Sequence, residues 1–320
     1  MSSISRREFG RIVGAGVPLA AILGPARLGA TGTVRLGVTT SSFRDFPRIQ
    51  GRDNVDDVVA ALQAARVTLV ELALSNVEPA PPSTRSFIGG TPAYPQRITF
   101  TPEQIASINA GARSTLRTWR IRTSPDALSP VRRKLTTAGI LVHACAVSYD
   151  DSFTDEEIEA TFRQVKALGA TTIASPLTLS MAARLRPFAE RHEMSVAIHN
   201  QPDRSAAGAI ATPQIKEALA LSPAFTLKLD IGNLTASNCD AVAELREHQP
   251  RVSHVLVKDR LRNGGASQYF GEGDTPIAGV LDLLKRSAFP IPALADYDYV
   301  GLHSPTEEVS ACLAFMSKAI

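Results

Sequence analysis

Four apolar runs in the second half of the chain each end on polar, ionisable residues. The residues at these ends are His199, Asp230, Lys258 with Asp259, and Asp296, and a helix-like stretch follows each run. The runs are residues 196–203 (VAIHNQPD), 227–234 (LKLDIGNL), 254–260 (HVLVKDR) and 293–299 (ALADYDY). In a (β/α)8 barrel, the C-terminal ends of the strands and the loops after them surround one active-site mouth. The pattern therefore predicts a small-molecule enzyme, or the descendant of one, with this fold.

Asp230 and His199 are the strongest single candidates. A carboxylate at a strand C-terminus in this fold is typically a metal ligand or an acid/base. The alternative for Asp230 is a cap on the next helix, but that helix is predicted to begin several residues later, near 235–238. The alternative for His199 is a satisfied core histidine. Polar residues also occupy positions 200, 201 and 203, however, and a protein core does not normally collect four polar side chains in so short a stretch.

The last two run ends contain pairs of charged residues. Asp296 and Asp298 are two positions apart, so they point the same way if the strand persists, and one of them is expected to face the mouth. Lys258 and Asp259 are neighbours, so they point to opposite sides and only one reaches a ligand. For Lys258, an anchor for a phosphate or oxyanion and a salt-bridge partner at the rim remain equal alternatives.

Three further polar residues are weaker candidates. Glu272 lies in the glycine-punctuated loop 271–276 and is expected to lean over the mouth, although such a loop also serves simply to launch the next helix. Glu71 in LVELAL and His143 in LVHACAV are expected to face inward on their strands, where single polar residues often have no chemical role.

Eight strand–helix units must position these residues. Strands alternating with helices favour a parallel sheet, and eight units favour a closed α/β (β/α)8 TIM barrel, here a single domain over residues 34–320. No GxGxxG or GxxxxGK[ST] motif occurs where a strand meets a helix, which disfavours dinucleotide-binding and P-loop folds.

Thr101 and Thr154 are predicted helix N-caps. The Pro-rich stretch 78–97 is predicted to be a long loop over the mouth. The predicted strands are 34–40, 67–73, 140–147, 171–175, 196–199, 226–230, 252–257 and 293–296.

The N-terminus carries a targeting pattern. Residues 5–9 (SRREF) match the twin-arginine motif, and a mildly apolar run follows at 12–23. That run is about a dozen residues and a membrane span needs roughly 20, so a stable membrane anchor is the weaker alternative. Residues 1–30 are therefore predicted to be a twin-arginine signal peptide, which places the protein in the periplasm or outside the cell.

Bulk composition excludes other classes of protein. Hydrophobic content of 44% and charged content of 20% are typical of a globular protein. A net charge of +3 without clustered Lys and Arg predicts no nucleic-acid partner. The 3 cysteines are widely spaced and form no CxxC or Cys/His cluster, so a structural zinc site is not expected.

The segments AIHN, DIGNLTASN and VLVKDR…GEGDTPI resemble strand-end motifs of the xylose-isomerase-like TIM-barrel superfamily, in the same order. This superfamily includes sugar-phosphate isomerases, ketose 3-epimerases and inosose-type dehydratases, and the resemblance covers nearly everything after residue 33. It implies one divalent cation (Mn²⁺, Co²⁺, Mg²⁺ or Zn²⁺) held by four strand-end side chains. It also implies two acidic groups that move a proton beside a carbonyl, on opposite faces of the substrate.

Carried onto this chain, the metal-ligand positions fall on His199, Asp230, Leu256 and Asp296. Leu256 stands where relatives have a histidine, and it has no lone pair with which to coordinate. His254 is no simple substitute, because it lies two residues earlier on the same strand face, about 6–7 Å further back. We therefore expect a weak metal site or none.

Other departures alter the site less. Relatives read HNH at 199–201, DIGH at 230–233 and Glu at 296, where this chain has Gln201, Asn233 and the shorter Asp296. Gln201 and Asn233 still form hydrogen bonds, so a sugar-binding pocket is compatible with the loss of the imidazoles.

These observations favour an exported isomerase or epimerase, with a lyase as a neighbouring reaction, acting on a sugar, keto-sugar or cyclitol. His199, Asp230 and Asp296 would frame the reacting centre. The residues predicted to bind substrate are Glu71, Gln201, Asn233, Lys258 and Glu272. The main alternative is a non-catalytic carbohydrate-binding relative that has lost its ion. Endonuclease chemistry is disfavoured, because it would need several metals, more His and Glu ligands and a basic surface.

Overall fold

The computed structural model describes residues 34–84, 87–91, 94–202, 208–287 and 290–320. The predicted signal peptide at 1–30 and Asp203 lie outside the described residues. Over the ranges that are described, no helix is both long enough and apolar enough to cross a membrane.

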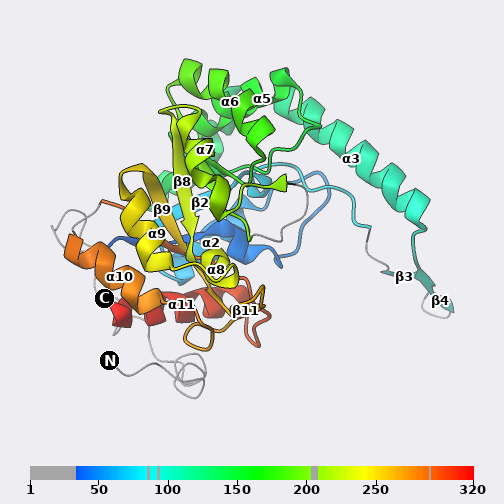
Figure 1. The fold of residues 1–320 in the computed structure, drawn as a ribbon. Coiled ribbons are helices and arrows are strands. Elements are labelled where there is room, and N and C mark those ends of the chain that lie inside the picture. The colour runs from blue at the N-terminus through cyan, green and yellow to red at the C-terminus, as the bar shows by residue number, and fades with distance from the viewer. Residues whose placement is uncertain (1–33, 85–86, 92–93, 203–207, 288–289) are drawn as a thin grey trace.

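Eight parallel strands close into a barrel in the order β1-β12-β9-β8-β7-β6-β5-β2 (Figure 1). The prediction of a (β/α)8 barrel is thereby confirmed. The strands are β1 (Leu36–Thr39), β2 (Leu69–Ala73), β5 (Leu141–Ala146), β6 (Thr172–Ser175), β7 (Ser195–His199), β8 (Phe225–Asp230), β9 (Val252–Val257) and β12 (Ala293–Ala295). Every residue of β2 and β6 is buried, as expected of parallel strands that are covered on both faces.

Helices surround the barrel and bury its outer face. They are α2 (Val55–Ala64), α3 (Pro102–Arg122), α4 (Ser129–Thr137), α5 (Asp155–Ala167), α6 (Leu179–His192), α7 (Ile215–Ala220), α8 (Ile231–Ala236), α9 (Ala241–His248), α10 (Ile277–Ser287) and α11 (Pro305–Ala319). The predicted N-caps are confirmed: Thr101 forms a capping box with Gln104 at the start of α3, and Thr154 accepts the Glu157 backbone N–H at the start of α5. A short 3-10 turn, Pro125–Leu128, precedes α4.

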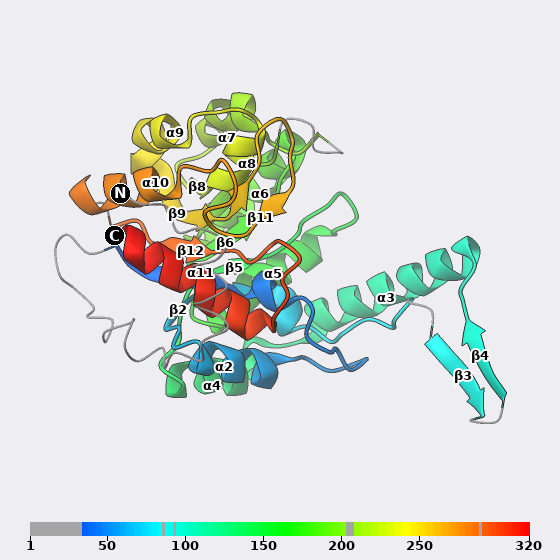
Figure 2. The same ribbon diagram turned by 90° about the horizontal axis from the view of Figure 1, so that it is seen from below.

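The stretch 78–97 is not the predicted loop over the mouth. It contains an antiparallel hairpin, β3 (Phe87–Thr91) with β4 (Tyr94–Ile98), whose backbone groups pair with one another. Figures 1 and 2 show this hairpin beyond the N-terminal end of α3, projecting away from the barrel. The other end of α3 is fixed by Arg120, which pairs with Glu78 at 2.6 Å and with Glu157 at 2.8 Å. The direction of the 21-residue α3 therefore carries the hairpin outward.

Candidate active site

Asp230 ends β8 and also caps the helix that follows. Its Oδ1 accepts the backbone N–H of Asn233 at 2.8 Å, and α8 begins at Ile231. The expectation that this helix begins near 235–238 was wrong. The helix has only 6 residues and includes Gly232, so its sequence carries little helical signal. Because the cap uses Oδ1, Oδ2 is the oxygen of Asp230 that faces the mouth.

Two basic groups meet at that Oδ2. His199 Nε2 and Lys258 Nζ each lie 2.9 Å from it. The backbone of Asp230 is held by the Asn200 side chain, which accepts from its N–H at 2.7 Å and donates to its carbonyl at 3.1 Å. Side chains from β7, β8 and the residue after β9 thus converge on one carboxylate.

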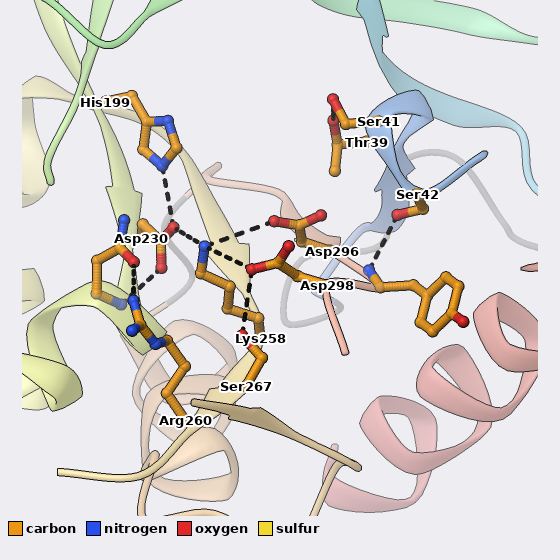
Figure 3. A network of polar contacts seen from close by, with 12 residues as sticks. Thr39, Ser41, Ser42, His199, Asp230, Lys258, Arg260, Ser267, Asp296 and Asp298 are labelled. Carbon is orange, nitrogen blue, oxygen red and sulfur yellow. Dashed lines mark hydrogen bonds and ion pairs between the residues drawn. The ribbon is translucent and has the colours of Figure 1, made fainter. Parts of the chain in front are cut away.

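Lys258 connects Asp230 to the last strand. Its Nζ lies 3.7 Å from Asp296 Oδ2 and 3.5 Å from Asp298 Oδ2, so three carboxylates face one ammonium (Figure 3). His199, Asp230 and Asp296, far apart in the sequence, are brought into one cluster around Lys258. The neighbour of Lys258, Asp259, points the other way and accepts backbone N–H groups from the loop at 271–275. The prediction that these two residues face opposite sides is confirmed.

The charges in this cluster are unequally compensated. Burial would raise the pKa of Asp230, but the Lys258 ammonium and the hydrogen bonds from His199 and Asn233 N–H outweigh burial and hold it well below its usual range. Burial would lower the pKa of Lys258, but the three carboxylates raise it, so Lys258 stays charged. Burial raises the pKa of Asp296 to about 6, and the like charge of Asp298 adds to this rise. The Lys258 ammonium opposes the shift but does not cancel it. Asp296 is therefore the carboxyl of the cluster that titrates close to neutral pH.

His199 is neutral at physiological pH. Burial, together with the positive charges of Lys228 and Lys258, lowers its pKa to about 4 despite the contact with Asp230. A neutral imidazole beside an ionised carboxylate carries its proton on the nitrogen that donates, here Nε2. The lone pair then lies on Nδ1, which can accept a hydrogen bond from a hydroxyl group.

A second charged cluster fills the barrel interior. Glu71 Oε1 accepts from Thr39 at 2.9 Å and from Lys228 Nζ at 2.6 Å, and Glu71 Oε2 pairs with His254 Nε2 at 3.0 Å. Glu71 and His254 are fully buried and Lys228 is buried. Glu71 was predicted to bind substrate, and such a contact would require these interior bonds to break. Lys228 and His254 precede Asp230 and Leu256 by two residues, which is the sequence signal that they share the same inward face.

Of the other predicted substrate-binding residues, Asn233 and Gln201 lie beside Asp230 and His199. Asn233 donates to Asn200 O at 3.0 Å, and its Oδ1 accepts from Arg260 at 2.9 Å. Gln201 Nε2 lies 3.4 Å from His199 O. Glu272 lies in the loop that Asp259 holds. Arg260 was missed, although its position two residues after Lys258 places it in the same strand-end motif.

The donor set does not fit the divalent cation that the motif resemblance implies. Leu256 packs against Leu69 and Leu294 inside the barrel, so an apolar cluster occupies the expected fourth position. Oδ1 of Asp230 is used by the helix cap and Oδ2 by an ammonium. Among the described residues, no group of three or more His, Cys, Asp or Glu side chains is arranged to hold a metal ion.

Comparison with known proteins supports the fold. The solved structures with a similar fold include xylose-isomerase-like TIM barrels and a sugar phosphate isomerase/epimerase. No family model matches the chain, and no curated protein matches its sequence.

Three solved structures illustrate the similarity, at 12% sequence identity each. An L-ribulose 3-epimerase has a TM-score of 0.60 over 90% of this chain and 94% of its own. The IolI protein with a binding zinc atom has a TM-score of 0.57 over 89% of this chain and 99% of its own. A xylose isomerase domain protein from Alicyclobacillus acidocaldarius subsp. acidocaldarius has a TM-score of 0.56 over 89% of this chain and 100% of its own.

Proposed function

We propose that the mouth binds a sugar, keto-sugar or cyclitol and moves a proton on a carbon next to its carbonyl group, as an isomerase or epimerase does. The observation that carries the proposal is Asp296, whose pKa is raised to about 6 and whose side chain lies beside the Lys258 ammonium. A general base works best when its pKa lies near the operating pH. The fold shared with an L-ribulose 3-epimerase supports the same class of reaction.

The proposed step uses this chain's own side chains. The Asp296 carboxylate removes a proton from the carbon next to the carbonyl, and the electron pair of the broken C–H bond moves onto the carbonyl oxygen. The Lys258 ammonium stabilises the negative charge that develops there. In an isomerase, protonated Asp296 returns the proton to the former carbonyl carbon, while the proton of the adjacent hydroxyl moves to the former carbonyl oxygen so that the new carbonyl forms. In an epimerase, a water molecule on the other face protonates the carbon, and Asp296 releases its proton to solvent. His199 Nδ1 accepts a hydrogen bond from a substrate hydroxyl and so orients the ring or chain.

The test replaces Asp296 by Asn and follows exchange of substrate C–H for deuterium by NMR, over a panel of ketoses and cyclitol ketones. Loss of a general base typically costs about 10²–10⁴-fold. For the wild-type protein, kcat/KM should rise with pH through a midpoint near 6, because only the ionised Asp296 accepts a proton. The matched control is Asp282→Asn on α10, whose carboxylate pairs with Arg286 outside the barrel. Full exchange by Asp296→Asn would refute the assignment of the base.

The second candidate is a non-catalytic carbohydrate-binding protein. It is favoured by the direct contacts of His199 and Lys258 with Asp230, which already engage three of the polar groups at the mouth. Saturable sugar binding by calorimetry, without deuterium exchange on any member of the panel, would support this candidate over the enzyme.

We also propose export by the twin-arginine route, supported by the sequence at 5–9. Replacing Arg6 and Arg7 with Lys should retain the protein in the cytoplasm, as measured by cell fractionation. Unchanged export would contradict the proposal.

A further inference from the structure

Lys258 is surrounded by acidic groups from two strand ends. Its Nζ lies 2.9 Å from Asp230, 3.5 Å from Asp298 and 3.7 Å from Asp296. The Lys258 side chain is 9% exposed, whereas that of Asp298 is 43% exposed. Three carboxylates thus face one ammonium at the opening of the barrel, and Figure 3 shows the ammonium between them.

The path of the Lys258 side chain is defined by its neighbours. A Cβ added to Gly232 would lie 2.5 Å from Lys258 Cγ and 2.9 Å from Lys258 O. Only glycine at this position of α8 lets the helix pack directly against the lysine stem. Packing against α8 thus fixes the start of the lysine side chain, and the 2.9 Å contact with Asp230 holds its ammonium.

We propose that Lys258 is the built-in cation of this mouth. Its ammonium occupies the place among the carboxylates where a divalent ion would otherwise be held, so the wild-type site excludes such ions. An ammonium has three N–H donors. One points to the close partner Asp230, and the two longer contacts leave donor capacity for a hydroxyl or carbonyl oxygen of a sugar. The inference rests on the geometry of the mouth and not on the proposed reaction.

The disagreement with a metal site has a direct electrostatic basis. A divalent ion in the same space would face the positive charge of Lys258 within a few ångströms, in a partly buried environment where repulsion is only weakly screened. Leu256 offers it no ligand. Removing the positive charge of Lys258 should therefore create affinity for a cation that the natural protein lacks.

The experiment measures thermal unfolding of metal-stripped wild-type protein, Lys258→Met and Lys216→Met with and without 1 mM Mn²⁺. Lys216 is the control, because it pairs with Glu247 on the exposed surface. Lys258→Met should gain a saturable rise in Tm of about 3–5 °C at Mn²⁺ concentrations far above its dissociation constant. The wild-type protein and Lys216→Met should show no rise. Adding Asp296→Asn to Lys258→Met should remove the gain.

Two results would overturn the inference. One is a Lys258→Met protein that folds and gains nothing from Mn²⁺. The other is wild-type protein that binds stoichiometric Mn²⁺ in an electron paramagnetic resonance titration and loses it on Asp296→Asn. If Lys258→Met does not fold, this titration of the wild-type protein decides alone, since the inference requires the signal of free Mn²⁺ to remain. Neither measurement depends on turnover, so failure of the proposed reaction and failure of this inference are distinguishable.

Discussion

The barrel contains two charged clusters, one centred on a carboxylate and one on a lysine, that differ in their balance of charge. In the interior, the single carboxylate of Glu71 is shared by Lys228, His254 and Thr39, and the pKa of Glu71 lies well below its usual range because Lys228 and His254 outweigh its burial. At the mouth, one ammonium faces three carboxylates, and the pKa of one of them is raised. In the interior, the charge of Glu71 is matched by Lys228, so the pair can stabilise the barrel. At the mouth, the carboxylates outnumber the ammonium, so Asp296 can gain or lose a proton near neutral pH.

The largest expected effect is on the interior cluster. Lys228→Met leaves Glu71 buried without its main partner, and breaking a buried pair in this way typically costs about 3–5 kcal/mol of unfolding free energy. Denaturant unfolding measures the loss. Lys134→Met, which removes an exposed pair with Asp56, is the control and should cost less than about 1 kcal/mol. A cost below about 1 kcal/mol for Lys228→Met would show that the interior cluster does not stabilise the barrel.

Removing a charge at the mouth should raise the free energy of unfolding, in contrast to the interior cluster. The pKa of Asp296 is about 6 in the folded protein and near 4 when unfolded, so its ionised form costs stability that grows as pH rises from about 4 through 6. Asp296→Asn should therefore raise the unfolding free energy at pH 7 by about 1–2 kcal/mol, while lowering the exchange rate by about 10²–10⁴-fold. A decrease in stability would mean that Asp296 holds the structure together, like Glu71.

Acid should lower the free energy of unfolding through Glu71 and Asp230, the two carboxylates whose pKa values are lowered by neighbouring cations. The pKa values of Glu71 and Asp230 are both lowered by folding, so their contribution is complete above pH of about 4 and is lost as pH falls through the folded pKa values. Urea unfolding between pH 2 and 5 should show this loss in wild type and Asp296→Asn alike. Stability that is unchanged below pH 4 would contradict it.

The smallest effect is expected at Asp298. Its negative charge helps to raise the pKa of Asp296, and its side chain is 43% exposed, so solvent weakens the interaction. Asp298→Asn should move the midpoint of the kcat/KM profile downward by roughly half a pH unit. An upward shift would show that Asp298 acts mainly through Lys258.

Local sequence patterns were sufficient to predict the barrel and the residues that gather at its mouth. Alternating strands and helices predicted the closed parallel sheet, and polar residues after apolar runs predicted the cluster of His199, Asp230 and Asp296, because strand ends must meet at one rim. Partners across the barrel were not predictable, since the pairing of Glu71 with Lys228 and His254 depends on strand stagger. The hairpin of β3 and β4 was missed because its strands contain Gly89, Gly90 and Pro95, residue types that typically interrupt a strand.

The double use of Asp230 limits what genetics can show at this site. One oxygen begins α8, and that helix carries Asn233, which Arg260 contacts. A substitution at 230 that offers no acceptor oxygen, such as Asp230→Ala, would remove this cap together with the charge, so its inactivity could not distinguish lost chemistry from a collapsed rim. Substitutions at 296, whose side chain caps no helix, separate the two outcomes.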